Sequence, residues 1–196
     1  MKEKIKSNKK TSRDKLLDVT FEEVYRYGYN GAATATILKK AAVPHGSMYH
    51  HFPSKKEMVL AMIEERLIPK VREFFSFEFK KDFTALALLE SLFVKVSKNK
   101  MLVTHGCPLH RLMFEMDALD ADIALACSTE FEKMSVNFQK ILIHGMRDGS
   151  IKEGDAKKMA DFILASSWGL LSKPAIYSSE EQFLEESQYF LEFLKP

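Results

Sequence analysis

The stretch PHGSMYHHFPSKKE, residues 44–57, decides the fold of the N-terminal part of the chain. Pro44 suits the first position of a helix, because it has no backbone N–H to leave unpaired. The second proline of the stretch interrupts that helix, which is expected over residues 44–50. Ser54 and Glu57 then form a capping box, a typical start of the next helix. The stretch therefore predicts a short helix, a tight turn and another helix.

Two further helices are expected before this stretch. Apolar residues recur at helical spacing after Thr11, and Gly28 follows them as a typical C-terminal cap, which predicts a helix over residues 12–27. A short second helix is expected over residues 33–42. Three helices joined by tight turns within about 40 residues follow the plan of a helix-turn-helix.

The rest of the chain continues the helical spacing, and no segment alternates as a β-strand does. Further helices are expected over residues 55–75, 82–99, 107–116, 119–147, 155–172 and 179–194, with Gly149, Asp155 and Ser179 as capping residues. We therefore expect an all-α chain of about nine helices. Its predicted parts are a basic disordered arm, a three-helix helix-turn-helix domain and a larger helical domain, over residues 1–10, 11–56 and 57–196.

Charge is distributed unevenly along the chain. Residues 1–56 contain 12 Lys and Arg against 5 Asp and Glu, whereas residues 57–196 contain 17 against 22. A basic module on a mildly acidic body is typical of a protein that meets a polyanion through one domain. The alternative is a solvated basic tail, since five of these lysines lie before Thr11.

The composition is that of an ordinary globular protein, with 46% apolar and 29% charged residues, which argues against disorder. No apolar stretch is long enough to span a bilayer, and no apolar core follows the first lysines, so that a signal peptide is not expected. Two cysteines are too few for a disulfide framework, and a cytoplasmic location is the expectation.

Motifs of other functional classes are missing from the sequence. It contains no Gly-rich phosphate loop, no HExxH, no GxSxG and no CxxC, and the adjacent His50 and His51 point to different sides of a helix, so an enzyme is not expected. His105, Cys107 and His110 suggest a metal site, but their spacing matches no standard zinc motif. We expect neither a cofactor nor a metal.

The short helix over residues 44–50 carries the candidate DNA contacts. Its small side chains suit the depth of a major groove, and Gly46 lets the backbone approach the DNA closely. Side chains able to donate hydrogen bonds to phosphates lie in and around it: Thr34, Tyr49, His50 and Lys55. Two alternatives stay open: Tyr49 packs into the three-helix core, and His50 is a surface residue without a contact.

These residues resemble the N-terminal module of tetracycline-repressor-type (TetR-family) regulators. The matching pattern runs from Gly28-Tyr29 through TATILKKAAV, residues 34–43, to GSMYHHFPSKKE, residues 46–57. The resemblance covers residues 11–62, and the run from Gly46 onward is its most specific part.

The chain departs from the family pattern at four positions. Leu38 stands where Ala is usual, and Ala42 stands where Gly is usual. Pro44 replaces the usual capping Ser, and His45 occupies a position that is often Lys. The last two departures lie in the expected recognition helix, so they leave the fold intact and make the operator sequence unpredictable.

The resemblance implies a role for each matching residue. Ser47 and His45 are expected to reach base edges, with Pro44 against a thymine methyl. The phosphate contacts are expected from Thr34, Tyr49, His50 and Lys55. The lysine-rich arm over residues 2–10 is expected along the DNA backbone or in the minor groove.

The resemblance also implies that residues 57–196 bind an effector and dimerise through a four-helix bundle made by the last two helices of each subunit. Candidate interface residues on these helices are Phe162, Ser166, Leu170, Phe183, Phe190 and Leu194. The alternative is that both helices only cover their own core. Met- and Phe-rich helices can enclose a plastic ligand cavity, although such residues are more often core, and the candidates are Phe93, Met113, Met134, Phe138 and Trp168.

Cys107 is the sharper candidate for sensing. Placed at an N-cap before Pro108, its thiol feels the positive end of the helix dipole, which predicts a lowered pKa, as an electrophile or oxidant sensor requires. The Gly-Cys pair here also resembles a branch of the family that includes regulators of reactive-electrophile detoxification genes. The alternative is a small buried cap residue, and Cys127 is expected to be packed inside a helix.

The sequence thus predicts a one-component transcriptional regulator. We expect a homodimeric repressor that a small molecule, or modification of Cys107, releases from a palindromic operator. Its partners are double-stranded operator DNA, a second copy of the chain and an unknown small-molecule effector, with no membrane. The alternative is a ligand-independent DNA-binding protein that acts through protein partners in chromosome or division control.

Overall fold

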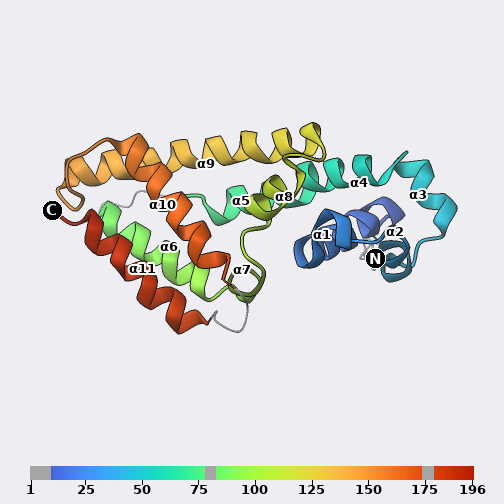
Figure 1. Cartoon of the computed structure of the whole chain (residues 1–196), viewed down its shortest axis with the longest axis horizontal. Coiled ribbons are helices and arrows are strands. Elements are labelled where there is room, and N and C mark those ends of the chain that lie inside the picture. Colours follow the sequence, from blue (N-terminus) through green and yellow to red (C-terminus); the bar gives the residue numbers. More distant parts are fainter. Residues whose placement is uncertain (1–9, 78–82, 174–178) are drawn as a thin grey trace, which may run out of the picture. The chain divides into compact units, whose positions relative to one another are not determined.

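The computed structural model describes residues 10–77, 83–173 and 179–196, and all regular structure within these ranges is helical (Figure 1). The all-α prediction is confirmed. Contacts divide the chain into two compact units, Met1–Pro69 and Lys70–Pro196, whereas the sequence places a functional boundary at residue 56. No helix of the described part is long and apolar enough to cross a membrane.

The first unit is built around α1 (Ser12–Gly31), which packs against α2 (Thr34–Ala41), α3 (His45–His51) and α4 (Lys55–Met62). Gly28 has φ 75° and breaks the helical backbone of α1 at the position where the sequence predicts its end. Apolar side chains from all four helices are fully buried in one core, among them Leu16, Leu17, Ile37, Met48 and Met58.

The local signals of the first unit act as expected, with one shift of register. The Ser54 hydroxyl accepts a hydrogen bond from the Glu57 N–H at 3.1 Å and so caps α4. Pro44 is the N-cap of α3 rather than its first helical residue, so the helix begins at His45, one residue later than the sequence suggests. Ala42 ends α2 in the left-handed conformation, with φ 53° and ψ 45°, which explains why glycine is usual at this position.

The helix expected over residues 55–75 is continuous but not uniform. Between α4 and α5 (Ile68–Phe74) lies a π-helical turn, η1 (Ile63–Leu67), in which the Ile68 N–H reaches the Ile63 carbonyl. Pro69 has no N–H to offer the carbonyl of Glu65, four residues earlier, and the guanidinium of Arg66 donates to that carbonyl at 3.1 Å. The proline therefore explains why the regular hydrogen-bond ladder is interrupted here.

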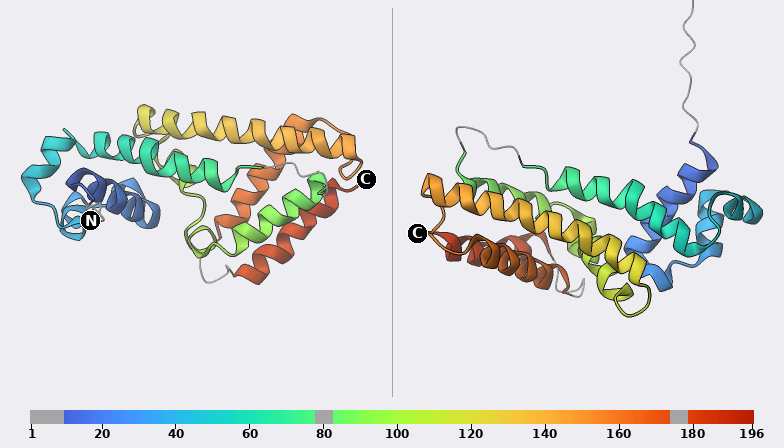
Figure 2. Two further views of the ribbon diagram at one scale, coloured as in Figure 1. Left: turned by 180° about the vertical axis from the view of Figure 1, so that it is seen from behind. Right: turned by 90° about the horizontal axis from the view of Figure 1, so that it is seen from above.

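The second unit consists of helices packed side by side (Figure 2). The long α9 (Ala121–Asp148) packs against α8 (Pro108–Met116) and α10 (Ala156–Leu171), and α11 (Glu180–Leu194) packs against α6 (Ala85–Ser97). Asp155 and Ser179 cap α10 and α11, and Gly149 ends α9, as predicted.

A short helix, α7 (Lys100–His105), was not predicted, because it follows α6 with hardly a break. It begins at Asn99, whose side-chain oxygen accepts hydrogen bonds from the N–H groups of Met101 and Leu102. An asparagine N-cap is the one local signal that marks this start.

Candidate nucleic-acid interface and effector pocket

The helix α3 presents a polar face to solvent and an apolar face to the core. Met48 and Phe52 are buried and hold α3 against α1 and α2. The residues on its other side, Pro44, His45, Gly46, Tyr49 and His50, are exposed, and Ser47 is half-exposed. Tyr49 is 54% exposed, so the alternative that it closes the core is wrong.

The surface of α3 is open at its glycine. A Cβ built on Gly46 would meet no atom within 4 Å, so packing inside the unit does not require a glycine here. The rings of His45 and Tyr49, one turn apart on the same helix, lie 5.4 Å from each other. Both donor side chains therefore share one side of a helix whose backbone is accessible at Gly46.

Thr34 and Lys55 are the first residues of α2 and α4, and both are half-buried. The ammonium of Lys55 donates to the Tyr29 carbonyl at 2.5 Å and lies 4.5 Å from the centre of the Tyr29 ring. Lys55 thus ties the start of α4 to the end of α1, a local role that the sequence did not reveal. The predicted arm lies outside the described residues except for Lys10, which pairs with Asp18 at 2.7 Å.

Ion pairs connect α1 to η1 within the first unit. Arg13 contacts Glu65 through two hydrogen bonds of 2.7 and 2.5 Å, and its guanidinium also lies over the ring of Phe52, 5.2 Å from the centre. Arg66 reaches Asp14 at 2.8 Å and Asp18 at 2.7 Å. The hydrogen bond from Arg13 holds the pKa of the Glu65 carboxyl below its usual value.

The five residues predicted to line one effector cavity are not brought together. Phe93 is buried in the core, where its ring packs 6.3 Å from Phe183 and 6.1 Å from Phe190. Trp168 stacks on His110 at 4.0 Å. Met113 borders a separate exposed groove of about 460 Å³ between α8 and the start of α9.

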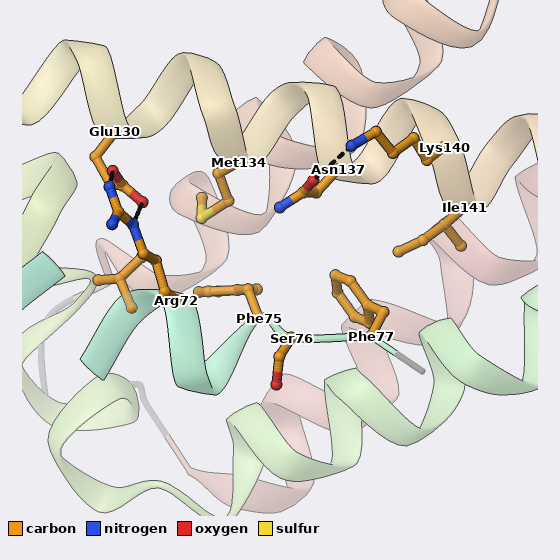
Figure 3. A pocket seen from close by; sticks show the side chains of 10 residues that line it. Arg72, Phe75, Ser76, Phe77, Glu130, Met134, Asn137, Lys140 and Ile141 are labelled. Carbon is orange, nitrogen blue, oxygen red and sulfur yellow. Dashed lines mark hydrogen bonds and ion pairs between the residues drawn. The ribbon is translucent and has the colours of Figure 1, made fainter. Parts of the chain in front are cut away.

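Of the predicted residues, Met134 lines a second pocket, of about 370 Å³, between residues 71–77 and α9 (Figure 3). Phe138 does not line the pocket: it is buried, and its ring centre lies 6.1 Å from that of Phe75 and 5.8 Å from that of Phe77. The described chain thus offers a ligand-sized hollow here, lined mainly by residues that the sequence did not single out.

An ion pair borders this pocket at one end. Arg72 Nε and Nη2 donate to the two carboxylate oxygens of Glu130 at 2.8 and 2.7 Å (Figure 3). The Glu130 carboxyl is only 5% exposed, and the Arg72 hydrogen bonds lower its pKa. The two residues lie 58 positions apart, so no local sequence signal points to the pair.

Cys107 is the N-cap of α8 and precedes Pro108, as predicted, but its environment differs from the expectation. Its thiol is buried, and burial raises its pKa, although the N–H groups of Leu109 and His110 act in the opposite direction. The expected lowering of the pKa is therefore wrong. Cys127 is fully buried, as expected, and burial raises its pKa to about 12. Within the described ranges, no three His, Cys, Asp or Glu side chains gather into a metal site.

The candidate dimer residues fall into two groups. Phe183 and Leu194 are 5% and 1% exposed, so they belong to the core of the subunit and the expectation that they contact a partner is corrected. Phe162 is 48% exposed, with the rings of Phe193 and Phe190 at 5.4 and 6.5 Å. Ser166 and Leu170 are half-exposed on the same helix. Two exposed aromatic residues of α11, Tyr189 and Phe193, were missed.

Comparison with known proteins adds independent information. The family model "Bacterial regulatory proteins, tetR family" matches residues 16–62. The HTH-type transcriptional repressor DhaR of Mycobacterium sp. (strain GP1) is 29% identical over 161 residues, which cover 80% of each protein. An uncharacterized HTH-type transcriptional regulator from the lacX 3' region of Lactococcus lactis subsp. lactis is 29% identical over 117 residues, which cover 59% of this chain and 60% of that relative.

Solved structures share the fold at lower identity. The regulatory protein TetR from Rhodobacter sphaeroides superposes with a TM-score of 0.83 at 21% identity, over 93% of this chain and 98% of that one. A TetR-family transcriptional regulator from Agrobacterium tumefaciens gives a TM-score of 0.81 at 20% identity, over 94% of this chain and 98% of that one.

A further relative by sequence is the nucleoid occlusion factor SlmA of Mannheimia succiniciproducens. It is 28% identical over 142 residues, which cover 70% of this chain and 63% of that relative.

Proposed function

The chain belongs to the tetR family of bacterial regulatory proteins and is a helix-turn-helix transcriptional regulator, and we propose that it is a homodimeric repressor released from its operator by a small molecule. One observation carries the proposal. The helix α3 is held to the core by Met48 and Phe52 and exposes a face of small and hydrogen-bonding side chains. Such a helix suits insertion into a major groove.

The proposed contacts divide by chemistry. His45 and Ser47 contact base edges and Pro44 a thymine methyl, because these residues lie on the exposed side of α3 around the open Gly46. Tyr49 and His50 donate to phosphates. Thr34 and Lys55 do so from the starts of α2 and α4. Lys55 keeps the capacity for this, since an ammonium has three protons and more than one acceptor can share them.

The proposed dimer uses the outer faces of α10 and α11. Phe162 and Phe193 form an exposed aromatic pair across these helices, beside the small residues Ala165 and Gly169, which are also exposed. A second copy related by a twofold axis would cover this patch and place two α3 helices on a palindromic site.

The proposed effector site is the 370 Å³ pocket beside Arg72. Every residue from Lys55 to Phe74 is helical, so one helical run carries both a proposed phosphate contact and a wall of the pocket. A ligand that binds the pocket more tightly in the released conformation than in the DNA-binding conformation would lower the affinity for DNA. A coupling free energy of about 1–3 kcal/mol would lower that affinity about 5–150-fold.

Covalent sensing at Cys107 is the competing mode of release. A buried thiol with a raised pKa reacts slowly with electrophiles, so we expect N-ethylmaleimide to leave the protein–operator complex intact in a gel-shift assay. Release of the wild type and of Cys127→Ser, combined with resistance of Cys107→Ser, would instead establish the thiol as the sensor.

Genome-wide mapping of the bound DNA tests the function as a whole. A one-component repressor is expected at few sites, beside its own gene or a neighbouring one. The similarity to a nucleoid occlusion factor favours a second candidate, a DNA-binding protein that acts through protein partners without a small effector. Many sites scattered over the chromosome would support this second function and contradict the first.

A further inference from the structure

The pocket of Figure 3, which lies wholly within the second unit, has a charge pattern that specifies a class of ligand. We propose that it binds a small aryl carboxylate, with the carboxylate at Lys140 and Asn137 and the aryl group over Phe75 and Phe77. This inference rests on the proposed effector role of the pocket and adds the chemistry of the effector.

Positive charge is in excess around the pocket. Glu130 is the one carboxylate among the described lining residues, and both of its oxygens are engaged by Arg72 at 2.8 and 2.7 Å. The Lys133 ammonium lies 3.5 Å from an oxygen of the same carboxylate, so two cations already compensate the charge of Glu130. Lys140 also lines the pocket and forms no ion pair with any residue of the described ranges. An anion is the ligand that balances this arrangement.

The hydrogen-bonding groups at the Lys140 end are donors. The Lys140 ammonium donates to Asn137 Oδ1 at 3.4 Å, and because an ammonium cannot accept, the amide oxygen must face it. The Asn137 amide nitrogen is consequently turned toward the pocket (Figure 3). Ser76 donates to the Glu73 carbonyl at 2.8 Å and its hydroxyl points away from the pocket. The Lys140 ammonium and the Asn137 amide N–H group are thus two donors at the exposed end of the pocket, and donors match the oxygens of a carboxylate.

The body of the pocket is apolar and partly aromatic. Phe75 and Phe77 form one wall, and Met134 and Ile141 of α9 face them (Figure 3). Aromatic edges and a thioether favour contact with another aromatic ring. The volume of about 370 Å³ lies at the lower end of the range for small-molecule sites, which suits a compact ligand of one ring and a short chain.

Three probes of nearly equal size and shape test the charge assignment: 3-phenylpropionate, 3-phenylpropionamide and 3-phenylpropylammonium. Calorimetric titration of the full chain is expected to show the carboxylate binding at least about tenfold more tightly than the amide, with the ammonium weakest. Equal or tighter binding of the amide or the ammonium would overturn the proposal, and so would the absence of binding by all three.

Variants at Lys140 connect the preference to the site. Lys140→Gln should remove the advantage of the carboxylate over the amide, and Lys140→Glu should make the ammonium the best of the three probes. Lys98→Gln is the control for Lys140→Gln, because it removes the same single positive charge at the end of α6, away from the pocket lining. It should keep the wild-type order of affinities. A wild-type order in Lys140→Glu would place the anion elsewhere.

The same probes separate this inference from the function on which it rests. If the carboxylate binds in the expected order but leaves the protein on its operator, the ligand class stands and the effector role of the pocket is refuted. If the ammonium releases the operator and the carboxylate does not, the effector role stands and the ligand class is wrong.

Discussion

At the scale of the residue, Ala42 departs from the family pattern at a structural cost. It is the only non-glycine residue with positive φ in the described part of the chain. A Cβ in the left-handed conformation destabilises the folded state by roughly 1–2 kcal/mol, and glycine removes this strain. Glycine also gives the unfolded chain more conformational freedom, which offsets about 0.4–1 kcal/mol of that gain. We expect Ala42→Gly to raise the free energy of unfolding by about 0.5–1 kcal/mol in urea denaturation.

The matched control for Ala42→Gly is the same change at an ordinary helical position. Ala35 is exposed inside α2, where glycine has only its entropic disadvantage. Ala35→Gly should therefore lower the free energy of unfolding by up to about 1 kcal/mol. Changes of the same sign in both variants would contradict the conformational explanation.

At the scale of the element, different residues of α3 are expected to contribute to the affinity for DNA and to the preference for its sequence. Tyr49→Phe removes a donor from an exposed ring and is expected to weaken binding to all DNA sequences by about 1 kcal/mol, because phosphates carry no sequence information. Ser47→Ala should instead change the preference at one base pair by about 1–3 kcal/mol. Binding titrations on a panel of duplexes measure both, and equal losses on every duplex for Ser47→Ala would remove it from the base contacts.

The contact between α1 and η1 is expected to weaken in acid. Arg13 lowers the pKa of Glu65 below the ordinary 4.5, so the pair stabilises the fold fully above pH 4.5 and loses this effect as the pH falls through the lower pKa of the folded state. The difference in unfolding free energy between wild type and Glu65→Gln should be below about 1 kcal/mol at neutral pH, since the pair is partly exposed, and should shrink as the pH falls below 4.5.

Glu22 provides the control on α1, the helix that carries Arg13. It is exposed and forms no ion pair within the described ranges, so Glu22→Gln makes the same change of side chain without breaking an ion pair. Denaturation curves between pH 3 and 7 measure both differences. A pH-independent difference for Glu65→Gln would show that the ion pair does not contribute.

At the scale of the whole molecule, the proposed dimer depends on an aromatic patch that a single subunit leaves uncovered. Phe162→Glu changes a side chain that is half exposed in the subunit, so the fold should survive, whereas a partner would bury the new charge. We expect dimerisation to weaken at least about 100-fold, measured by sedimentation velocity.

Leu125→Glu is the matched control for association, because Leu125 is an exposed apolar residue of α9, which is not one of the proposed interface helices. It should sediment as the wild type does. If Phe162→Glu leaves the dimer unchanged while Leu125→Glu disrupts it, the interface involves α9 and the proposed four-helix bundle is wrong.

Much of the fold follows from interactions between neighbours in the sequence. Ser54, Asp155 and Ser179 satisfy N–H groups two or three residues ahead, and Gly149 turns the chain after α9, so these boundaries depend on no distant contact. The polar face of α3 could be found in the same way, because it needs only helical periodicity and side chains that do not pack.

What the sequence by itself determined is therefore the order of the helices, most of their ends and the identity of the DNA-binding module. The tertiary structure alone decided which apolar residues meet solvent: Phe162 is exposed and Phe183 buried, although both lie on amphipathic helices. It also joined Arg72 to Glu130 and raised the pKa of Cys107, because burial depends on helices far apart in the sequence. Local signals report the hydrogen bonds of a helix end, whereas solvation and ion pairing are set by the surrounding fold.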